Sequence, residues 1–444
     1  MTTATDILKK SWWEAVKAYF QPKMLAMMAL GFASGLPFMM YFSKLSRWLT
    51  DAEIDKSTIG FFYWIGLAYA LKFIWAPIVD RAKLPVLTKW LGQRRSWMFF
   101  AIIGTIIGMG VISLANPAPN VPGSLTVMIV GAFILTYSGA TLDIAVDAWR
   151  IESGSNDEQA NLAAVYQLGY RFAIMAAGYA MIIADFATWN LTYRVTALIM
   201  MLVLGVVLFV KEPTPDARNK DSKGLSDAFK TYMVEPFSSF VTRYNIWVVP
   251  VLLLVCLYRL SDFTMGVMTQ PLYADLGFTK TTVGLITGTF GPWPLIGGAF
   301  ISGLFCVRIG LMRTLLIGAI LTILTNGAFA WLATQTDTSA VKLTVAIVAD
   351  NIAAGFVGTV FIAYMSSLVD RRYAATQYAL LSSGYALFCK ILAGFSGVLY
   401  DKVGAVTFFS ITAGYGLPAI ILILFIWKFG PPRALGIQTK SLQP

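Results

Sequence analysis

The residues of this chain that could do chemistry are charged side chains set in long apolar stretches of sequence. A charged side chain in hydrocarbon costs at least about 2.5–3.5 kcal/mol, so such residues almost always face a bundle interior or a water-filled cavity. Near the middle of these stretches three cations stand against two acids, which predicts a cavity that binds anionic solutes. The group consists of Arg171, Arg259, Asp262, Asp350 and Lys390, together with Lys72 in the inner half of another stretch.

Two roles are predicted for this group, holding the substrate and carrying protons. The chain has no histidine, so proton coupling near neutral pH has to use carboxylates. Arg259 and Asp262 are three residues apart and could instead pair with each other. The cations predicted to bind substrate carboxylates or to act as counter-charges are Arg259, Lys390, Arg171 and Lys72, and the predicted protonation sites are Asp262 and Asp350.

A second pair of carboxylates, Asp143 and Asp147, ends an apolar run in the segment GATLDIAVDAWRIE. Their spacing of four residues puts both on one helix face. Asp143 lies about 26 Å into a hydrocarbon core of about 30 Å, which is close to the inner side. This depth favours a gating role, with ion pairs to Arg150, Arg171 or Arg94, while a proton-coupling role stays open.

Long apolar helices must position these side chains. The chain has 444 residues, 57% of them hydrophobic and 13% charged, whereas soluble proteins average about 25% charged. We therefore expect an all-α polytopic membrane protein with twelve transmembrane helices. The expected spans are roughly 24–43, 58–79, 96–115, 124–146, 161–184, 190–210, 246–268, 281–303, 313–333, 341–366, 374–399 and 404–427.

An internal repeat divides these spans into two sets of six. The segment WLTDAEIDKSTIG matches LYADLGFTKTTVG, 224 residues further on, in an Asp, a Thr and a Gly. Two parallel six-helix repeats are the signature of the major facilitator fold. The expected domains are an interfacial amphipathic N-terminal helix (1–23), an N-terminal six-helix bundle (24–210), a cytoplasmic linker (211–243), a C-terminal six-helix bundle (244–428) and a cytoplasmic tail (429–444).

Positive charge indicates the orientation. Of the 34 Lys and Arg residues, 23 fall on the side that carries both termini and 7 on the other. The positive-inside rule therefore predicts that both termini are cytoplasmic. The net charge of +11 is explained by this topology, so no nucleic-acid partner is expected.

Two basic inner loops resemble the facilitator loop pattern G-x3-D-R-x-G-R-R. The first copy is interrupted by an insertion, and the second has Val307 where the acid should be. We predict that these loops latch the inner face, and a generic basic loop is the alternative. The predicted gating residues are Asp80, Arg81, Gly92, Arg94, Arg95, Arg150, Arg308, Gly310 and Arg313.

The eighth apolar stretch, GTFGPWPLIGGAFISG, is interrupted by Pro292 and Pro294. Broken helices often line transporter binding sites, although kinks also serve packing. Aromatic faces in such a site could stack on sugar rings. The aromatic residues predicted to bind substrate are Tyr258, Trp293 and Tyr385.

Several longer strings resemble one family, the AmpG muropeptide permeases of the peptide/acetyl-coenzyme-A transporter group in the major facilitator superfamily. They are GFASGLPF, GLAYALKFIWAPIVDR followed by GQRRSW, and SGATLDIAVDAWRIE. The resemblance implies proton-driven import of N-acetylglucosamine-anhydro-N-acetylmuramic acid peptides across the bacterial inner membrane, in cell-wall recycling and β-lactamase induction. Siderophore and acetyl-coenzyme-A transporters share the same loop strings, so import of a siderophore or another anionic solute is the alternative.

Other classes of function find little support. Without histidine the commonest acid–base and metal constellations are missing, and no G-x4-G-K-[ST] loop is present. Gly139, Asp143 and Asp147 match half of a CDP-alcohol phosphotransferase motif, but its D-G-x2-A-R half is absent. We therefore expect no enzyme, no cofactor and no metal, although a sensor that binds without transport stays open. The expected partners are an anionic glycopeptide, protons and the lipid bilayer, and the chain is expected to be a monomer.

Overall fold

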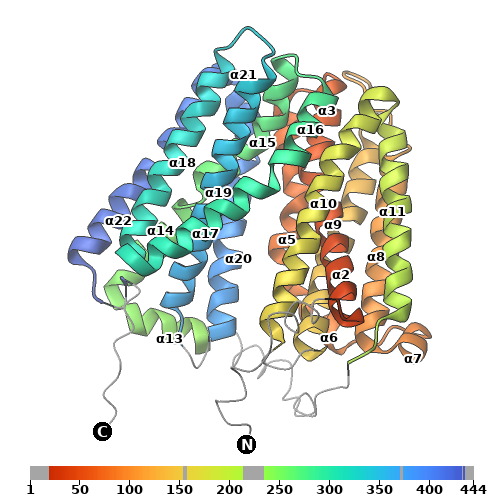
Figure 1. Cartoon of the computed structure of the whole chain (residues 1–444), viewed down its shortest axis with the longest axis horizontal. Coiled ribbons are helices and arrows are strands. Elements are labelled where there is room, and N and C mark those ends of the chain that lie inside the picture. The colour runs from red at the N-terminus through yellow and green to blue at the C-terminus, as the bar shows by residue number, and fades with distance from the viewer. Residues whose placement is uncertain (1–19, 154–157, 214–234, 371–373, 433, 436–444) are drawn as a thin grey trace, which may run out of the picture. The chain divides into compact units, whose positions relative to one another are not determined.

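The structure is a computed structural model of the whole chain, and it describes residues 20–153, 158–213, 235–370, 374–432 and 434–435 (Figure 1). Within these ranges the regular elements are all helices. Most of the expected N-terminal interfacial helix, of the expected linker and of the expected tail lies outside the described residues.

The chain forms two compact units, and the first comprises 1–41, 72–116 and 122–218. Its closest helix pairs are α8 with α9 and α2 with α10. Its helices are α2 (Pro22–Met39), α6 (Ala76–Arg81), α7 (Leu87–Leu91), α8 (Gln93–Ile112), α9 (Thr126–Ser153), α10 (Gln159–Phe186) and α11 (Trp189–Phe209).

The second unit comprises 42–71, 117–121 and 219–444. A cluster of buried apolar side chains from α14, α18, α19 and α22 forms its core. Its helices are α3 (Ser46–Asp51), α4 (Lys56–Phe62), α5 (Ala68–Leu71), α13 (Glu235–Tyr244), α14 (Val248–Leu257), α15 (Leu260–Asp275), α16 (Lys280–Phe290), α17 (Pro292–Ile309), α18 (Leu311–Ala333), α19 (Ala340–Leu368), α20 (Ala374–Ala393), α21 (Ser396–Gly414) and α22 (Leu417–Phe429).

Ten helical stretches among the described residues are long and apolar enough to cross a membrane. The expected span 161–184 is helical as part of α10. The expected span 374–399 is divided, because α20 ends at Ala393 and α21 begins at Ser396. Neither α10 nor α20 is among these ten. In α20 the apolar stretch is the shorter segment Leu380–Ala393, and α10 carries polar side chains such as Gln167. The all-helical membrane architecture is confirmed, and the count of twelve spans stays a prediction.

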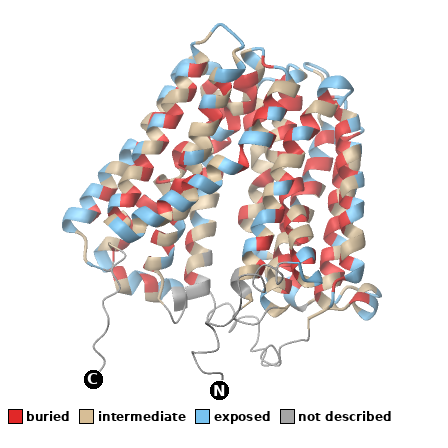
Figure 2. Ribbon diagram, in the orientation of Figure 1, coloured by how far each residue is buried: buried red, intermediate tan, exposed pale blue. Residues whose placement is uncertain are grey.

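Local sequence explains where several helices begin and break. Asp55 and Thr188 lie at helix N-caps, where their side chains accept hydrogen bonds from Thr58 N and Leu191 N. A π-helical turn follows α2, and α14 ends one turn before α15 begins. Figure 2 shows buried and exposed residues alternating along the long helices, as expected when each buries only part of its surface.

Two glycines occupy the same backbone conformation at equivalent helix starts. Gly92 has φ 89° and ψ 179° before α8, and Gly310 has φ 87° and ψ 162° before α18. This region of φ and ψ is essentially open to glycine alone. Each helix is the one that follows a basic loop predicted from the sequence, so the internal repeat is visible in the backbone.

Candidate functional site

A polar cavity of about 290 Å³ lies inside the second unit. Three helices build it: α15 with the residue before it, the middle of α16, and the middle of α19. Its lining residues are Arg259, Asp262, Met265, Gly266, Thr269, Gln270, Tyr273, Thr287, Ile347, Asp350, Asn351 and Ala354.

A helix break positions the first two charged residues of this cavity. The chain turns between α14 and α15, and Arg259 is the N-cap residue of α15 with φ −104° and ψ −3°. Asp262 follows in the first turn, and its Oδ2 lies 3.4 Å from Arg259 Nη1. Both side chains are about four-fifths buried, with 19% and 18% exposure. The pairing that the sequence spacing allowed is therefore present.

Asp350 brings a second carboxylate to the same cavity from α19. It interacts electrostatically with both Asp262 and Arg259. Two carboxylates and one guanidinium leave a net charge of −1 when all three are ionised. Asn351 adds an amide that donates one N–H of Nδ2 to Ile347 O at 2.8 Å, which leaves the second N–H and the amide oxygen for a ligand.

Gln270 is a polar lining residue that the sequence did not single out. Its side chain is 6% exposed, and its Oε1 is buried without a hydrogen-bond partner among the described residues. An unmade hydrogen bond of this kind costs about 1–3 kcal/mol. Because Gln270 lines the cavity, a ligand is a candidate donor to this oxygen. Nothing in the sequence separates Gln270 from other polar residues of apolar helices.

The predicted aromatic residues lie outside the lining of this cavity. Tyr258 donates through its hydroxyl to Leu315 O at 3.1 Å, and its ring stacks on Phe361 at 5.2 Å between centroids. Tyr385 makes an edge contact with Phe361. Trp293 is 63% exposed on α17. In this structure Tyr258 and Tyr385 help to pack the core beside the cavity.

Lys390 on α20 is 6% exposed and also lies outside the cavity lining. Its ammonium donates to Gly66 O at 3.1 Å. It also lies 4.9 Å from the ring centroid of Phe42 and 5.7 Å from that of Tyr69. A carbonyl oxygen and two aromatic faces therefore solvate this buried cation.

In the first unit, the pair predicted from GATLDIAVDAWRIE has cationic partners. Lys72 Nζ lies 3.5 Å from Asp143 Oδ2, with side-chain exposures of 33% and 19%. Asp147 Oδ1 lies 3.4 Å from Arg150 Nη2 within α9. The sequence had left Lys72 without a local acid, and the fold supplies Asp143 from 71 residues further on.

Arg94 organises the predicted loop residues at one end of the first unit. Its Nη1 lies 2.7 Å from Asp80 Oδ1, and its Nε donates to both oxygens of Glu152 at 3.1 and 3.0 Å. Glu212 accepts hydrogen bonds from the backbone N–H groups of Arg94 and Arg95, so it caps the N-terminus of α8 from 118 residues away. Neither Glu152 nor Glu212 was predicted from the sequence.

The remaining predicted residues have simpler surroundings. Arg95 donates through Nε to Val207 O at 3.0 Å. Arg171 is half-buried on α10. Arg308 is exposed, and the Arg313 guanidinium lies 5.8 Å from the Trp427 ring centroid. The backbone of Arg81 ends α6, and its side chain lies outside the description.

Comparison with known sequences gives the family. The Major Facilitator Superfamily profile matches residues 24–389 and 251–441. The anhydromuropeptide permease of Escherichia coli (strain K12) is 31% identical over 412 residues, covering 92% of this chain and 80% of that protein. A Rickettsia conorii relative named AmpG 4 is 31% identical over 413 residues, covering 92% and 98%.

Comparison with solved structures gives the same fold. A D-xylose–proton symporter has a TM-score of 0.69 at 15% identity, covering 94% of this chain and 99% of that chain. The nucleoside transporter NupG has a TM-score of 0.66 at 15% identity, covering 92% and 100%. The expected fold class and the expected resemblance are both confirmed, and the chain belongs to the Major Facilitator Superfamily as a multi-pass, AmpG-like membrane transporter rather than an enzyme.

Proposed function

We propose that this transporter imports anhydro-muropeptides, which are N-acetylglucosamine-anhydro-N-acetylmuramic acid peptides, across the bacterial inner membrane in symport with protons. The similarity to the anhydromuropeptide permease over 92% of the chain supports the substrate class. In this proposal the solute enters cell-wall recycling and the induction of β-lactamase. A siderophore or another anionic solute is the alternative cargo.

The cavity of the second unit is the observation that carries the proposed coupling. Arg259 can bind a substrate carboxylate, and Asp350 or Asp262 can bind the proton that travels with it. With one cation and two acids in contact with the same space, each charge alters the affinity of the others. Binding of an anion at Arg259 leaves both carboxylates without their cation and so favours uptake of a proton.

Transport in this proposal proceeds by alternating access of the two six-helix domains, 24–210 and 244–428, joined by the linker. Asp143, Asp147 and the Arg94 cluster, defined as Arg94 with Asp80, Glu152 and Glu212, act as inner gate residues. Both termini are cytoplasmic, and the monomer is the working unit. Lys72 pairs with Asp143, so opening of this gate exposes a carboxylate that can also bind a proton.

The decisive experiment is uptake of labelled anhydro-muropeptide into proteoliposomes, with and without an inward proton gradient. Uptake that falls to background when the gradient is removed supports both the cargo and the coupling. Uptake that is independent of the gradient contradicts the coupling and leaves the cargo in place. No uptake by folded protein, together with uptake of a ferric siderophore, moves the proposal to the alternative cargo.

A further inference from the structure

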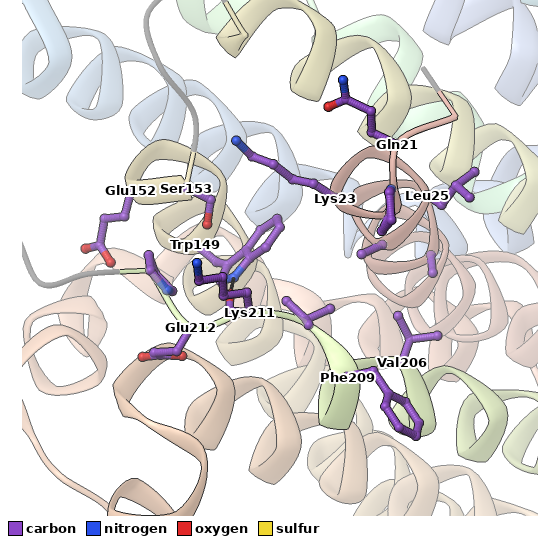
Figure 3. A pocket seen from close by; sticks show the side chains of 15 residues that line it. Gln21, Lys23, Leu25, Trp149, Glu152, Ser153, Val206, Phe209, Lys211 and Glu212 are labelled. Atoms are coloured by element: carbon purple, nitrogen blue, oxygen red, sulfur yellow. Dashed lines mark hydrogen bonds between the residues drawn. The ribbon is translucent and has the colours of Figure 1, made fainter. Parts of the chain in front are cut away.

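A pocket of about 910 Å³ lies at one end of the helices of the first unit. The start of α2, the end of α9, and the end of α11 with the residues that follow it build its walls (Figure 3). All three helices belong to candidate membrane spans. The pocket therefore lies where these spans leave the bilayer, on the side that the positive charges assign to the cytoplasm.

One wall of this pocket is apolar and faces outward from the unit. Leu25 is 44% exposed and Phe209 is 90% exposed, and Val206 lies between them in Figure 3. Large apolar side chains exposed at this depth contact lipid chains in a membrane protein. The wall therefore continues the lipid-facing surface into the pocket.

The opposite wall carries hydrogen-bond donors. Lys23 and Lys211 line the pocket together with the Ser153 hydroxyl. No carboxylate of the described residues pairs with the Lys211 ammonium. The Ser153 oxygen has no hydrogen-bond partner in the described part of the chain. Lys23 Nζ is paired with Glu158 at 2.8 Å.

The two carboxylates of the lining, Glu152 and Glu212, are already engaged. Glu152 accepts from the Arg94 guanidinium, and Glu212 accepts from two backbone N–H groups at the start of α8. Their negative charge is therefore compensated inside the protein. The pocket therefore offers a ligand the ammonium groups of its lysines and a hydroxyl group, next to an apolar wall.

The pocket is also fixed before any ligand arrives. Trp149 is 2% exposed, and its indole N–H donates to Lys211 O at 3.1 Å. This bond joins the end of α9 to the segment after α11, as the dashed line in Figure 3 shows. A site whose walls are held in place loses less entropy on binding.

We propose that this pocket binds an anionic phospholipid of the cytoplasmic leaflet. The phosphate lies against Lys211 and Ser153, with Lys23 at the rim, and an acyl chain follows Leu25, Val206 and Phe209 out of the pocket. A lysine near an anionic membrane surface contributes about 1 kcal/mol of attraction, which corresponds to about fivefold in affinity. Because Glu152 and Glu212 belong both to the pocket lining and to the Arg94 cluster, the bound lipid lies next to that cluster.

The test is native mass spectrometry of the purified full chain titrated with phosphatidylglycerol. Phosphatidylethanolamine and glycerol 3-phosphate are titrated in parallel. Lys211→Gln should weaken phosphatidylglycerol binding by about fivefold. Lys428→Gln is the matched control, because Lys428 is an exposed lysine at the end of a span outside the pocket, and it should leave binding unchanged.

A second variant tests the apolar wall. Val206→Trp places a bulky ring where the acyl chain should lie, so it should weaken phosphatidylglycerol binding, and its unfolding temperature shows whether it folds. Equal binding by wild type and Lys211→Gln overturns the proposal. Equal affinity for phosphatidylethanolamine overturns its charge selectivity. Displacement of the lipid by glycerol 3-phosphate at similar concentration means that the site takes soluble phosphates instead.

Discussion

Arg259, Asp262 and Asp350 share one cavity, so the charge state of each depends on the other two. The ion pair of Arg259 with Asp262 compensates one carboxylate, and no ion pair of Asp350 is found among the described residues. In the proposed function a proton balances the charge of Asp350. Gln270 contributes an amide oxygen that the described residues leave unsatisfied. At this scale the proposed function separates into a proton step and a ligand hydrogen bond, which can be tested separately.

Asp350→Asn should abolish accumulation of substrate driven by a proton gradient while exchange of substrate across the membrane continues. Asparagine is uncharged, like a protonated carboxyl group, so this variant keeps the cavity at the charge it has when Asp350 carries a proton. Proteoliposome uptake and counterflow measure the two activities. Asp337→Asn is the control, because Asp337 lies in an exposed loop where it pairs with Lys342 at 2.7 Å. Gradient-driven accumulation by Asp350→Asn at the wild-type level would rule Asp350 out as the proton site.

Gln270→Leu should raise KM for uptake by about 5–150-fold, the range that corresponds to a hydrogen bond of about 1–3 kcal/mol. Its unfolding temperature should stay the same or rise, because the substitution removes a buried polar group that is unsatisfied without ligand. Gln335→Leu, at a half-buried position beside Trp331 and outside the cavity lining, is the control. A fall in stability with an unchanged KM would make Gln270 a packing residue.

At the scale of elements, the positions where helices begin and break decide where the charges lie. The turn between α14 and α15 sets Arg259 beside Asp262. The segment after α11 returns Glu212 to the start of α8, where its carboxylate interacts favourably with the helix dipole. Gly92 and Gly310 let the chain enter α8 and α18 in a conformation that other residues adopt only with strain.

Gly92→Ala should destabilise the protein more than Gly310→Ala. Both substitutions carry the cost of an unfavourable φ, about 1–3 kcal/mol. A Cβ at Gly310 meets open space, whereas a Cβ at Gly92 collides with the Glu212 side chain and disturbs the cap of α8. Unfolding temperatures of the purified variants in one detergent measure the difference. Equal losses at the two sites would show that the Glu212 contact adds nothing.

At the scale of the whole molecule, the chain is divided differently in space than along the sequence. Residues 42–71 precede the expected linker but belong to the second compact unit. There Lys56 Nζ lies 2.8 Å from Asp275 Oδ1, and the Ser57 hydroxyl donates to Asp401 Oδ2 at 2.6 Å. If the two six-helix domains move as proposed, these contacts must break and re-form in every cycle.

Lys56→Gln combined with Asp401→Asn should change the rate of uptake by up to about fivefold while the unfolding temperature changes little. Exposed polar pairs contribute about 0–1 kcal/mol each. This free energy is small beside the total stability of the protein, but it is large enough to change the populations of two conformations of similar energy. Uptake rates and unfolding temperatures are measured on the same preparations. Lys342→Gln, at a loop ion pair within the same unit, is the control. An unchanged rate would mean that these contacts persist throughout the cycle.

Much of the fold could be predicted from the sequence, because the cost of placing polar groups in hydrocarbon acts on each stretch separately. The apolar runs gave the helices, and the strings around Lys72 and Asp143 gave the family. The Arg259–Asp262 pair was also predictable, because residues that are three positions apart in a helix lie about one turn apart and can contact each other. The weaker span signal of α20 comes from the length of its apolar stretch, which is the short segment Leu380–Ala393.

Only the tertiary structure decided which distant residues meet. Lys72 reaches Asp143, Glu212 reaches the start of α8, and Lys390 reaches the rings of Phe42 and Tyr69. Such partners depend on how whole helices pack, and packing is set by the shapes of many side chains at once rather than by local spacing. Glu152, Glu212 and Gln270 are ordinary polar residues in the sequence. Only their surroundings in the fold place Gln270 in the cavity lining and both glutamates in the Arg94 cluster. The sequence by itself determined that the charged side chains must be kept away from lipid. Only the fold determined which residues surround each of them.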